Sequence, residues 1–199
     1  MTPQGAPQKS NTTTVVLIVL AVGGVSLFCC VATLAAIAVP NFVKFNVRAR
    51  QAEVKANLKS AYAAQRAYFD DKDTYSESID EVGFLPERSN RYRYVFAPAS
   101  DSLFPGSPDG GAHNGVLADQ RPSPPPDNAT LLAGIPPALL AEAGLHGKCP
   151  EACHITMLAV GNLDGDSDVD VWSISTMVRT IGGVSVPAGQ PYNDFDDVK

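Results

Sequence analysis

The sequence contains no charged residue between Lys9 and Lys44, and within this interval the segment from Thr14 to Val39 is predominantly apolar. A buried core helix is disfavoured for this run, because a domain this small has no centre large enough to surround it. At about 1.5 Å per residue, a helix over this segment crosses a bilayer core of roughly 30 Å. The run therefore predicts a transmembrane helix over residues 14–43.

A cleaved signal peptide is the alternative for the same segment. Ala36-Ile37-Ala38 has the small residues of a cleavage site. However, the apolar run exceeds the usual ~7–15 residues, and the leader has Lys9 as its only charged side chain. A retained anchor is therefore favoured. Residues 1–13, rich in Pro, Gln, Ser and Thr, are expected to form a disordered leader.

The sequence also lacks the short motifs of common enzyme classes. It has no Gly-x-Ser-x-Gly elbow, phosphate loop or dinucleotide fingerprint, and its three histidines fall in predicted loops or at a strand edge. No basic patch with interleaved aromatic residues lies outside the membrane-proximal helix, which argues against a nucleic-acid partner. A structural or binding role is favoured over an enzyme.

Charge is divided unevenly along the chain. Seven basic and three acidic residues lie between Lys44 and Lys72, whereas eight acidic and two basic residues lie from Cys149 to the end. A basic helix and an acidic head can dock on each other, within one chain or between neighbours. Two solvated faces that never meet are the alternative.

Beyond Pro40 the sequence predicts that the helix continues over residues 44–72. Apolar side chains recur there at three- and four-residue steps, with Gln65 among them, and this stripe needs a sheet to cover it. The remainder, 73–199, is expected to form one globular head. Strands are predicted at 91–96, 154–160, 169–175 and 178–186, short helices at 79–82 and 138–143, and an irregular proline-rich excursion at 97–137. The predicted class is α+β, with a long helix packed on a small antiparallel sheet.

Several segments of the chain carry a family resemblance. AAIAVPNF at 35–42, followed by RARQAEVKANL at 48–58, resembles the N-terminal helix of type IV pilins and the related type II secretion pseudopilins. The region 161–174 is similar to the closing strand region of such pilins. The resemblance implies a pilin-like fold and a membrane-anchored structural or accessory subunit of a pilus or type II secretion-like filament. It also implies other pilin-like subunits as partners, in homo- or hetero-oligomers. We call the apolar N-terminal part of the long helix the stem. The stem residues expected to serve anchoring and assembly are Gly23, Pro40, Phe42 and Phe45.

The chain departs from this family at its N-terminus. Family members carry a basic leader ending in Gly, a cleavage point, an aromatic residue and, four residues later, a glutamate. Counting back from Pro40, the cleavage point falls between Ile18 and Val19, and Gly23 occupies the glutamate position. The sequence therefore predicts a stem kept in the membrane without standard processing. The alternative function is a membrane-tethered extracytoplasmic binding module that has the pilin-like fold and does not polymerise.

Two signals conflict over membrane orientation. The basic residues after the span place the head in the cytoplasm by the positive-inside rule. The cysteine pair at Cys149 and Cys153 instead favours an oxidising compartment. The pilin resemblance agrees with the cysteines. We therefore expect a single-pass inner-membrane protein whose C-terminal domain lies in the periplasm or at the cell surface.

The segment 162–170 places oxygen ligands at every second position. Calcium prefers about 6–8 oxygen ligands, and some pseudopilins hold calcium in a C-terminal loop. The pattern is not an EF-hand, because Ser167 occupies the required glycine position. The alternative is an Asx-rich turn that satisfies local backbone amides. The candidate calcium ligands are Asn162, Asp164, Asp166, Asp168 and Asp170.

Cys149 and Cys153 are expected to form a local disulfide. Together with His146 and His154 they have the ligand types for zinc, but zinc sites usually use two separated pairs. Free thiols are the third possibility. The other two cysteines, at 29 and 30, lie in the apolar run as small apolar residues or as acylation sites.

Overall fold

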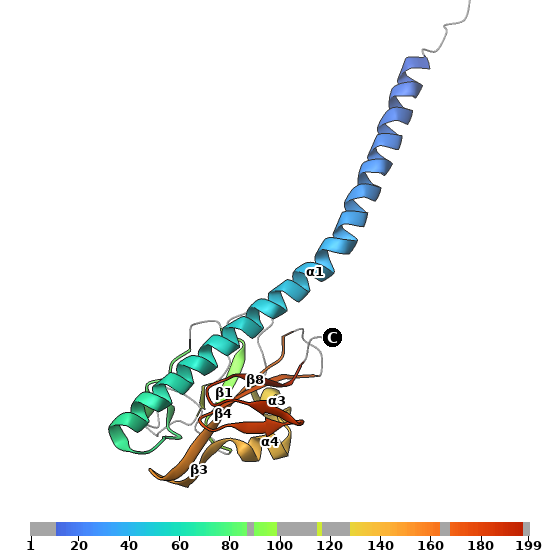
Figure 1. The fold of residues 1–199 in the computed structure, drawn as a ribbon. Coiled ribbons are helices and arrows are strands. Elements are labelled where there is room, and N and C mark those ends of the chain that lie inside the picture. Colours follow the sequence, from blue (N-terminus) through green and yellow to red (C-terminus); the bar gives the residue numbers. More distant parts are fainter. Residues whose placement is uncertain (1–10, 87–89, 99–114, 117–127, 164–167, 197–199) are drawn as a thin grey trace, which may run out of the picture. The chain divides into compact units, whose positions relative to one another are not determined.

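The computed structural model of the chain describes residues 11–86, 90–98, 115–116, 128–163 and 168–196 (Figure 1). The chain divides into two compact units, residues 1–45 and 46–199, and each is considered by itself. Most of the predicted leader, and the excursion at 99–114 and 117–127, lie outside the described residues.

A single helix, α1 (Asn11–Lys72), provides the described structure of the first unit. Its stretch Val15–Leu34 is 20 residues long and is apolar enough to cross a membrane. At about 1.5 Å per residue this stretch measures roughly 30 Å, which matches a bilayer core. The helix runs through Pro40 without interruption. The predicted transmembrane segment is therefore helical and of sufficient length.

In the second unit, α1 buries the predicted stripe. Val54, Leu58 and Ala61 are fully buried, and the polar Gln65 is buried with them. Gln65 is paired at both ends of its amide, because Nε2 donates to the Ser76 carbonyl at 2.6 Å and Oε1 accepts from the Ser76 amide at 3.2 Å. The stripe thus contributes side chains to the core, and Gln65 fixes the loop that follows the helix through its hydrogen bonds.

The helix ends at Lys72, and Asp73 takes a left-handed φ of 55°. The amide of Asp73 still donates to the Phe69 carbonyl at 2.9 Å, which satisfies one terminal carbonyl. A short helix follows, α2 (Ile79–Val82), whose N-cap Ser78 accepts a hydrogen bond from the Glu81 amide. This segment returns the chain to the sheet.

The sheet of the head has six antiparallel strands in the order β2-β1-β4-β5-β8, with β3 pairing on β4. A separate two-stranded hairpin consists of β6 (Arg179–Ile181) and β7 (Val184–Val186). The strands of the main sheet are β1 (Tyr92–Val95), β2 (Gly115–Val116), β3 (Gly144–Lys148), β4 (Ala152–Gly161), β5 (Asp170–Ser175) and β8 (Tyr192–Phe195).

Helices cover both faces of this sheet. On one face, the α1 stripe packs with Met157, Trp172 and other inward-pointing strand residues. On the other face, α3 (Asn128–Ala133) and α4 (Pro137–Glu142) pack with Leu158 and Val171. Alternate residues along β4 and β5 contribute to opposite clusters, as the period-2 geometry of a strand requires. The head is therefore a three-layer arrangement with the sheet in the middle.

The fold class is the α+β class expected from the sequence. Strands β1 and β5 fall within the predicted ranges, and β4 (Ala152–Gly161) extends beyond the predicted 154–160 at both ends. The predicted strand at 178–186 is instead the β6–β7 hairpin turning at Gly182 and Gly183. The predicted excursion at 97–137 also contains regular structure, namely β2 and α3. Strands β3 and β8 were not predicted, because neither shows a regular alternation of apolar and polar residues.

Candidate functional site

The first candidate feature is the apolar surface of α1 in the first unit. Large apolar side chains along Val15–Leu34 are exposed, including Phe28, and Phe42 and Phe45 are exposed further along. A continuous apolar surface of this length is unstable in water and requires lipid or other apolar helices around it. A side chain at Gly23 would meet no atom within 4 Å. This segment can therefore insert into a membrane or pack against similar helices.

A buried carboxylate connects the sheet to α1. Asp170, at the start of β5, is fully buried, and its Oδ2 atom accepts hydrogen bonds of 2.6 Å from both the Tyr92 hydroxyl and the Trp172 indole. Its Oδ1 atom accepts from Asn193 at 2.9 Å, and Gln51 on α1 lies 3.5 Å away. Burial raises the pKa of Asp170, and these hydrogen bonds oppose the rise. The same burial and the Asp170 charge raise the pKa of Tyr92.

This geometry bears on the predicted calcium ligands. Both oxygens of Asp170 accept hydrogen bonds from neighbouring side chains. Asp164 and Asp166 lie outside the described residues. Within the part of the chain that is described, no three His, Cys, Asp or Glu side chains gather as a metal cluster. Calcium at Asn162, Asp164, Asp166, Asp168 and Asp170 stays a prediction.

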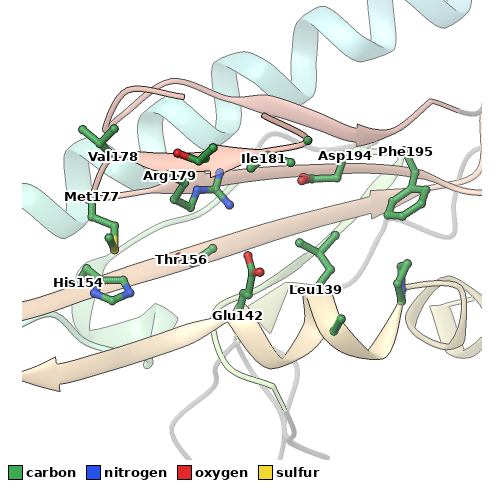
Figure 2. Close-up of a pocket in the computed structure, with 14 residues that line it drawn as sticks. Leu139, Glu142, His154, Thr156, Met177, Val178, Arg179, Ile181, Asp194 and Phe195 are labelled. Carbon is green, nitrogen blue, oxygen red and sulfur yellow. The ribbon is translucent and has the colours of Figure 1, made fainter. Parts of the chain in front are cut away.

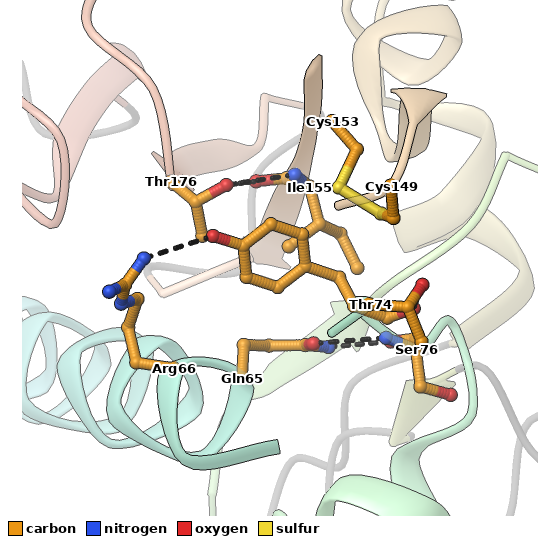
Figure 3. Close-up of a disulfide and its surroundings, with 9 residues drawn as sticks. Gln65, Arg66, Thr74, Ser76, Cys149, Cys153, Ile155 and Thr176 are labelled. Atoms are coloured by element: carbon orange, nitrogen blue, oxygen red, sulfur yellow. Dashed lines mark hydrogen bonds between the residues drawn. A yellow bond between two sulfur atoms is a disulfide. The ribbon is translucent and has the colours of Figure 1, made fainter. Parts of the chain in front are cut away.

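Cys149 and Cys153 form a disulfide at the turn between β3 and β4, with a Cα–Cα separation of 4.9 Å (Figure 3). Both side chains pack against the core cluster beneath α1. The zinc and free-thiol alternatives are therefore wrong, since zinc requires thiolates and these sulfurs are bonded to each other. His146 and His154 pair across β3 and β4 with stacked rings 5.3 Å apart. Cys29 and Cys30 are free and exposed on α1.

A groove of about 640 Å³ lies on the face of the sheet that carries α4 (Figure 2). Four elements contribute to it: α4, β4, the β6–β7 hairpin and β8. Figure 2 shows Glu142, Arg179 and Asp194 pointing toward the space between them. We call this the acidic groove. It is lined by Leu139, Glu142, His154, Met177, Val178, Arg179, Asp194, Phe195 and six neighbouring residues.

Two charged residues of the acidic groove, Arg179 and Asp194, hydrogen-bond the same serine. Arg179 donates through Nη2 to the Ser173 hydroxyl at 2.8 Å, and Ser173 also hydrogen-bonds Asp194. Burial raises the pKa of Asp194 to about 6, although Ser173 and the Arg179 charge act against the rise. Burial also lowers the pKa of Arg179. The Oδ2 atom of Asp194 is buried with no hydrogen-bond partner among the described residues.

A second, basic pocket of about 500 Å³ lies beside α1. Lys55 and Lys59 line it together with the loop 187–191. Both lysines are exposed, and the Lys55 ammonium sits 4.7 Å from the centre of the Trp172 ring. The head therefore presents lysines on the α1 side of the sheet and carboxylates on the α4 side.

Sequence reasoning identified the stem and the disulfide but missed the acidic groove. Its three charged residues come from 142, 179 and 194, and no short motif links them. The excess of acidic residues after Cys149 was the available signal, but it does not specify which carboxylates come together. The arrangement of both surfaces suits binding to another macromolecule.

Comparison with known proteins identifies relatives of the chain. Residues 45–104 match the family model of the type IV pilin PilA. The type IV major pilin protein PilA of Myxococcus xanthus (strain DK1622) is 35% identical over 197 residues, covering 83% of this chain and 84% of that protein. The family match begins at the end of the exposed apolar segment and includes the buried stripe of α1.

Proposed function

Because this chain belongs to the type IV pilin family, we propose that it is a structural subunit of a type IV filament system. In this role α1 anchors the subunit in the membrane and packs against other pilin-like subunits. A structural role is preferred to an accessory one because the matched relative is named a major pilin and is covered over 84% of its length.

The two successive surfaces of α1 are the observation that carries this proposal. Val15–Leu34 exposes its apolar side chains, whereas Val54, Leu58 and Ala61 on the same helix are buried by the sheet. The sheet of the head thus covers the apolar side chains on its part of α1. The exposed apolar stretch is left to contact lipid or other helices.

The disulfide supports a proposal for the compartment of the head. A disulfide between Cys149 and Cys153 persists in an oxidising environment and is rare in the cytoplasm. We propose that the head lies outside the cytoplasm, in the periplasm or at the cell surface, with a single pass through the inner membrane. The basic residues Arg48 and Arg50 after the stem are the opposing signal.

A second candidate is a membrane-tethered binding module that does not polymerise. Gly23 favours it, since the family's glutamate at this position pairs with a neighbour's amino terminus, and a buried charge in lipid rewards such pairing. Without that charge, the stem lacks one interaction that would favour ordered packing against neighbouring subunits.

Shearing of cells, followed by mass spectrometry of the sheared filaments and of the membrane fraction, separates the two candidates. The structural role predicts the full-length head in the sheared filaments, and an N-methylated terminus near Val19 would show standard processing. A chain found entirely in membranes with an intact Met1 would instead support the binding module and contradict the filament role.

A further inference from the structure

The rim of the acidic groove has the composition of a protein-docking surface. Met177, Val178 and Phe195 are 42%, 58% and 48% exposed, and all three line the groove. Large apolar side chains exposed together around polar groups are typical of interaction sites rather than of inert surface. A groove of about 640 Å³ also admits side chains from another protein.

The charge inside the groove selects the sign of that partner. Glu142, Asp194 and Arg179 all line the groove, so two carboxylates face one guanidinium. Both carboxylates oppose the fall in the Arg179 pKa that burial causes. Among the described residues, the buried Oδ2 atom of Asp194 and the buried Nε and Nη1 atoms of Arg179 have no hydrogen-bond partner. The groove therefore has an excess of negative charge, and a lysine or arginine side chain complements it.

The same chain presents such lysines on the opposite side of its sheet. Lys55 and Lys59 are exposed on α1, which covers one face, whereas α4 and the groove belong to the other face. Because the sheet separates them, one copy cannot place its own Lys59 in its own groove. A second copy can place its Lys59 in the groove of the first. The groove and the lysine surface are then two different patches on each subunit.

We propose that the acidic groove of one copy receives Lys59 and the adjoining surface of α1 from a second copy. This inference rests on the proposed filament role, and it names a contact between heads. Such a contact is heterologous, because each subunit uses its groove toward one neighbour and its lysine toward another. A heterologous contact whose rotation does not close generates an open helical series, which is the symmetry of a filament.

Photo-crosslinking from the groove identifies its occupant. The full-length chain carries p-benzoylphenylalanine in place of Phe195, and cells produce a mixture of isotopically heavy and light copies. We expect irradiation to join position 195 of one copy to an α1 peptide containing Lys59 of the other, as heavy–light pairs. Crosslinks confined to one copy, to a different region of the chain or to a different protein would overturn the proposal.

Charge exchange tests the same contact without the photoprobe. Glu142→Lys and Lys59→Glu are each expected to lower the yield of sheared filament about tenfold, because each brings like charges together. The double variant is expected to recover most of that yield. Glu151→Lys serves as the matched control, since Glu151 is also exposed but lies in the β3–β4 turn outside the groove.

The outcomes separate this contact from the filament role itself. Filaments whose yield is unchanged in both single variants would overturn the groove contact alone. Absence of filaments and of heavy–light crosslinks from the unmodified chain would overturn both. Trp172 fluorescence checks that each variant keeps a folded head, and both substituted positions are exposed.

Discussion

Tyr92 on β1 donates its hydroxyl to Asp170 on β5 at 2.6 Å, across the intervening strand β4. Gly161 on β4 is the residue paired with both of them in register. A Cβ atom at Gly161 would lie 2.9 Å from the Tyr92 ring and 3.1 Å from the Arg91 carbonyl oxygen. The missing side chain therefore lets the Tyr92 ring cross β4 and reach the carboxylate.

Gly161→Ala is expected to lower the free energy of unfolding by about 2 kcal/mol, because the methyl group displaces the ring and weakens the bond to Asp170. Trp172 is the single tryptophan and also bonds Asp170, so its fluorescence reports the change directly. The measurement is a urea titration of the full chain in detergent. Gly24→Ala is the control, since a side chain there meets no atom within 4 Å.

Leu58→Ala tests the contact between α1 and the sheet. Leu58 is fully buried in the same cluster as Trp172, so its truncation is expected to destabilise the head by about 2–5 kcal/mol. Leu85→Ala removes the same atoms from a side chain that is 73% exposed, and it is expected to change stability by less than about 0.5 kcal/mol. Equal urea midpoints for the two variants would contradict the packing described for α1.

Asp194→Asn tests the pH dependence of the acidic groove. Burial raises the pKa of Asp194 from 3.8 to about 6, so the folded head holds this proton more tightly than the unfolded chain does. The resulting stabilisation is full below pH 3.8 and is lost as the pH rises through about 6. The neutral amide does not undergo this loss. Its melting temperature relative to the unmodified chain is therefore expected to rise between pH 4 and 7.

The matched control for this pH series is Asp80→Asn, because Asp80 is exposed on α2. This variant shows how the loss of one exposed carboxylate changes the melting temperature at each pH. A difference between Asp194→Asn and the unmodified chain that stays constant from pH 4 to 7 would show that the Asp194 carboxyl is not perturbed in the fold.

The disulfide predicts a defined thiol count. Under denaturing, non-reducing conditions a polyethylene-glycol maleimide is expected to add two groups, to Cys29 and Cys30, and after reduction it is expected to add four. Replacing Cys149 and Cys153 together by Ser is expected to lower stability by about 2 kcal/mol, because the closed loop is short. Four groups added before reduction would contradict the bridge.

The proposed calcium site predicts ligand-dependent stability. At a calcium concentration one hundred times its dissociation constant, binding to the folded head stabilises it by about 2.7 kcal/mol. Thermal melting with added calcium is expected to show this shift, and Asp164→Asn with Asp166→Asn is expected to abolish it. An unchanged melting temperature in millimolar calcium, with magnesium as the comparison ion, would remove the site from consideration.

Local periodicity made α1 and the central strands predictable. Leu58 and Gln65 recur at helical spacing, which marks the buried side of α1. Val171 and Trp172 are β-branched and aromatic residues typical of a strand, and β5 is buried on both faces. Gln65 fits this pattern although it is polar, because the loop after α1 supplies both of its hydrogen bonds.

The groove and the Asp170 network were not predictable in the same way. Asp170 lies 78 residues from Tyr92, and Glu142 and Asp194 meet only after β4, β5 and β8 have paired. Sequence reasoning assigned Asp170 to a calcium loop because its carboxylate follows three others at even spacing. In the structure its oxygens accept hydrogen bonds from Tyr92, Trp172 and Asn193, which tertiary contact alone brings together.

The continuity of α1 also imposes an order on synthesis. Leu58 is made early, but Met157 and Ile174, with which it shares a core, emerge about a hundred or more residues later. Until then the stripe that ends at Gln65 has no sheet to cover it, and the apolar stem beside it is already available for insertion. Non-local pairing of this kind folds slowly and leaves apolar surface uncovered in the meantime. The α1 stripe of the nascent head is therefore uncovered until β4 and β5 have been made.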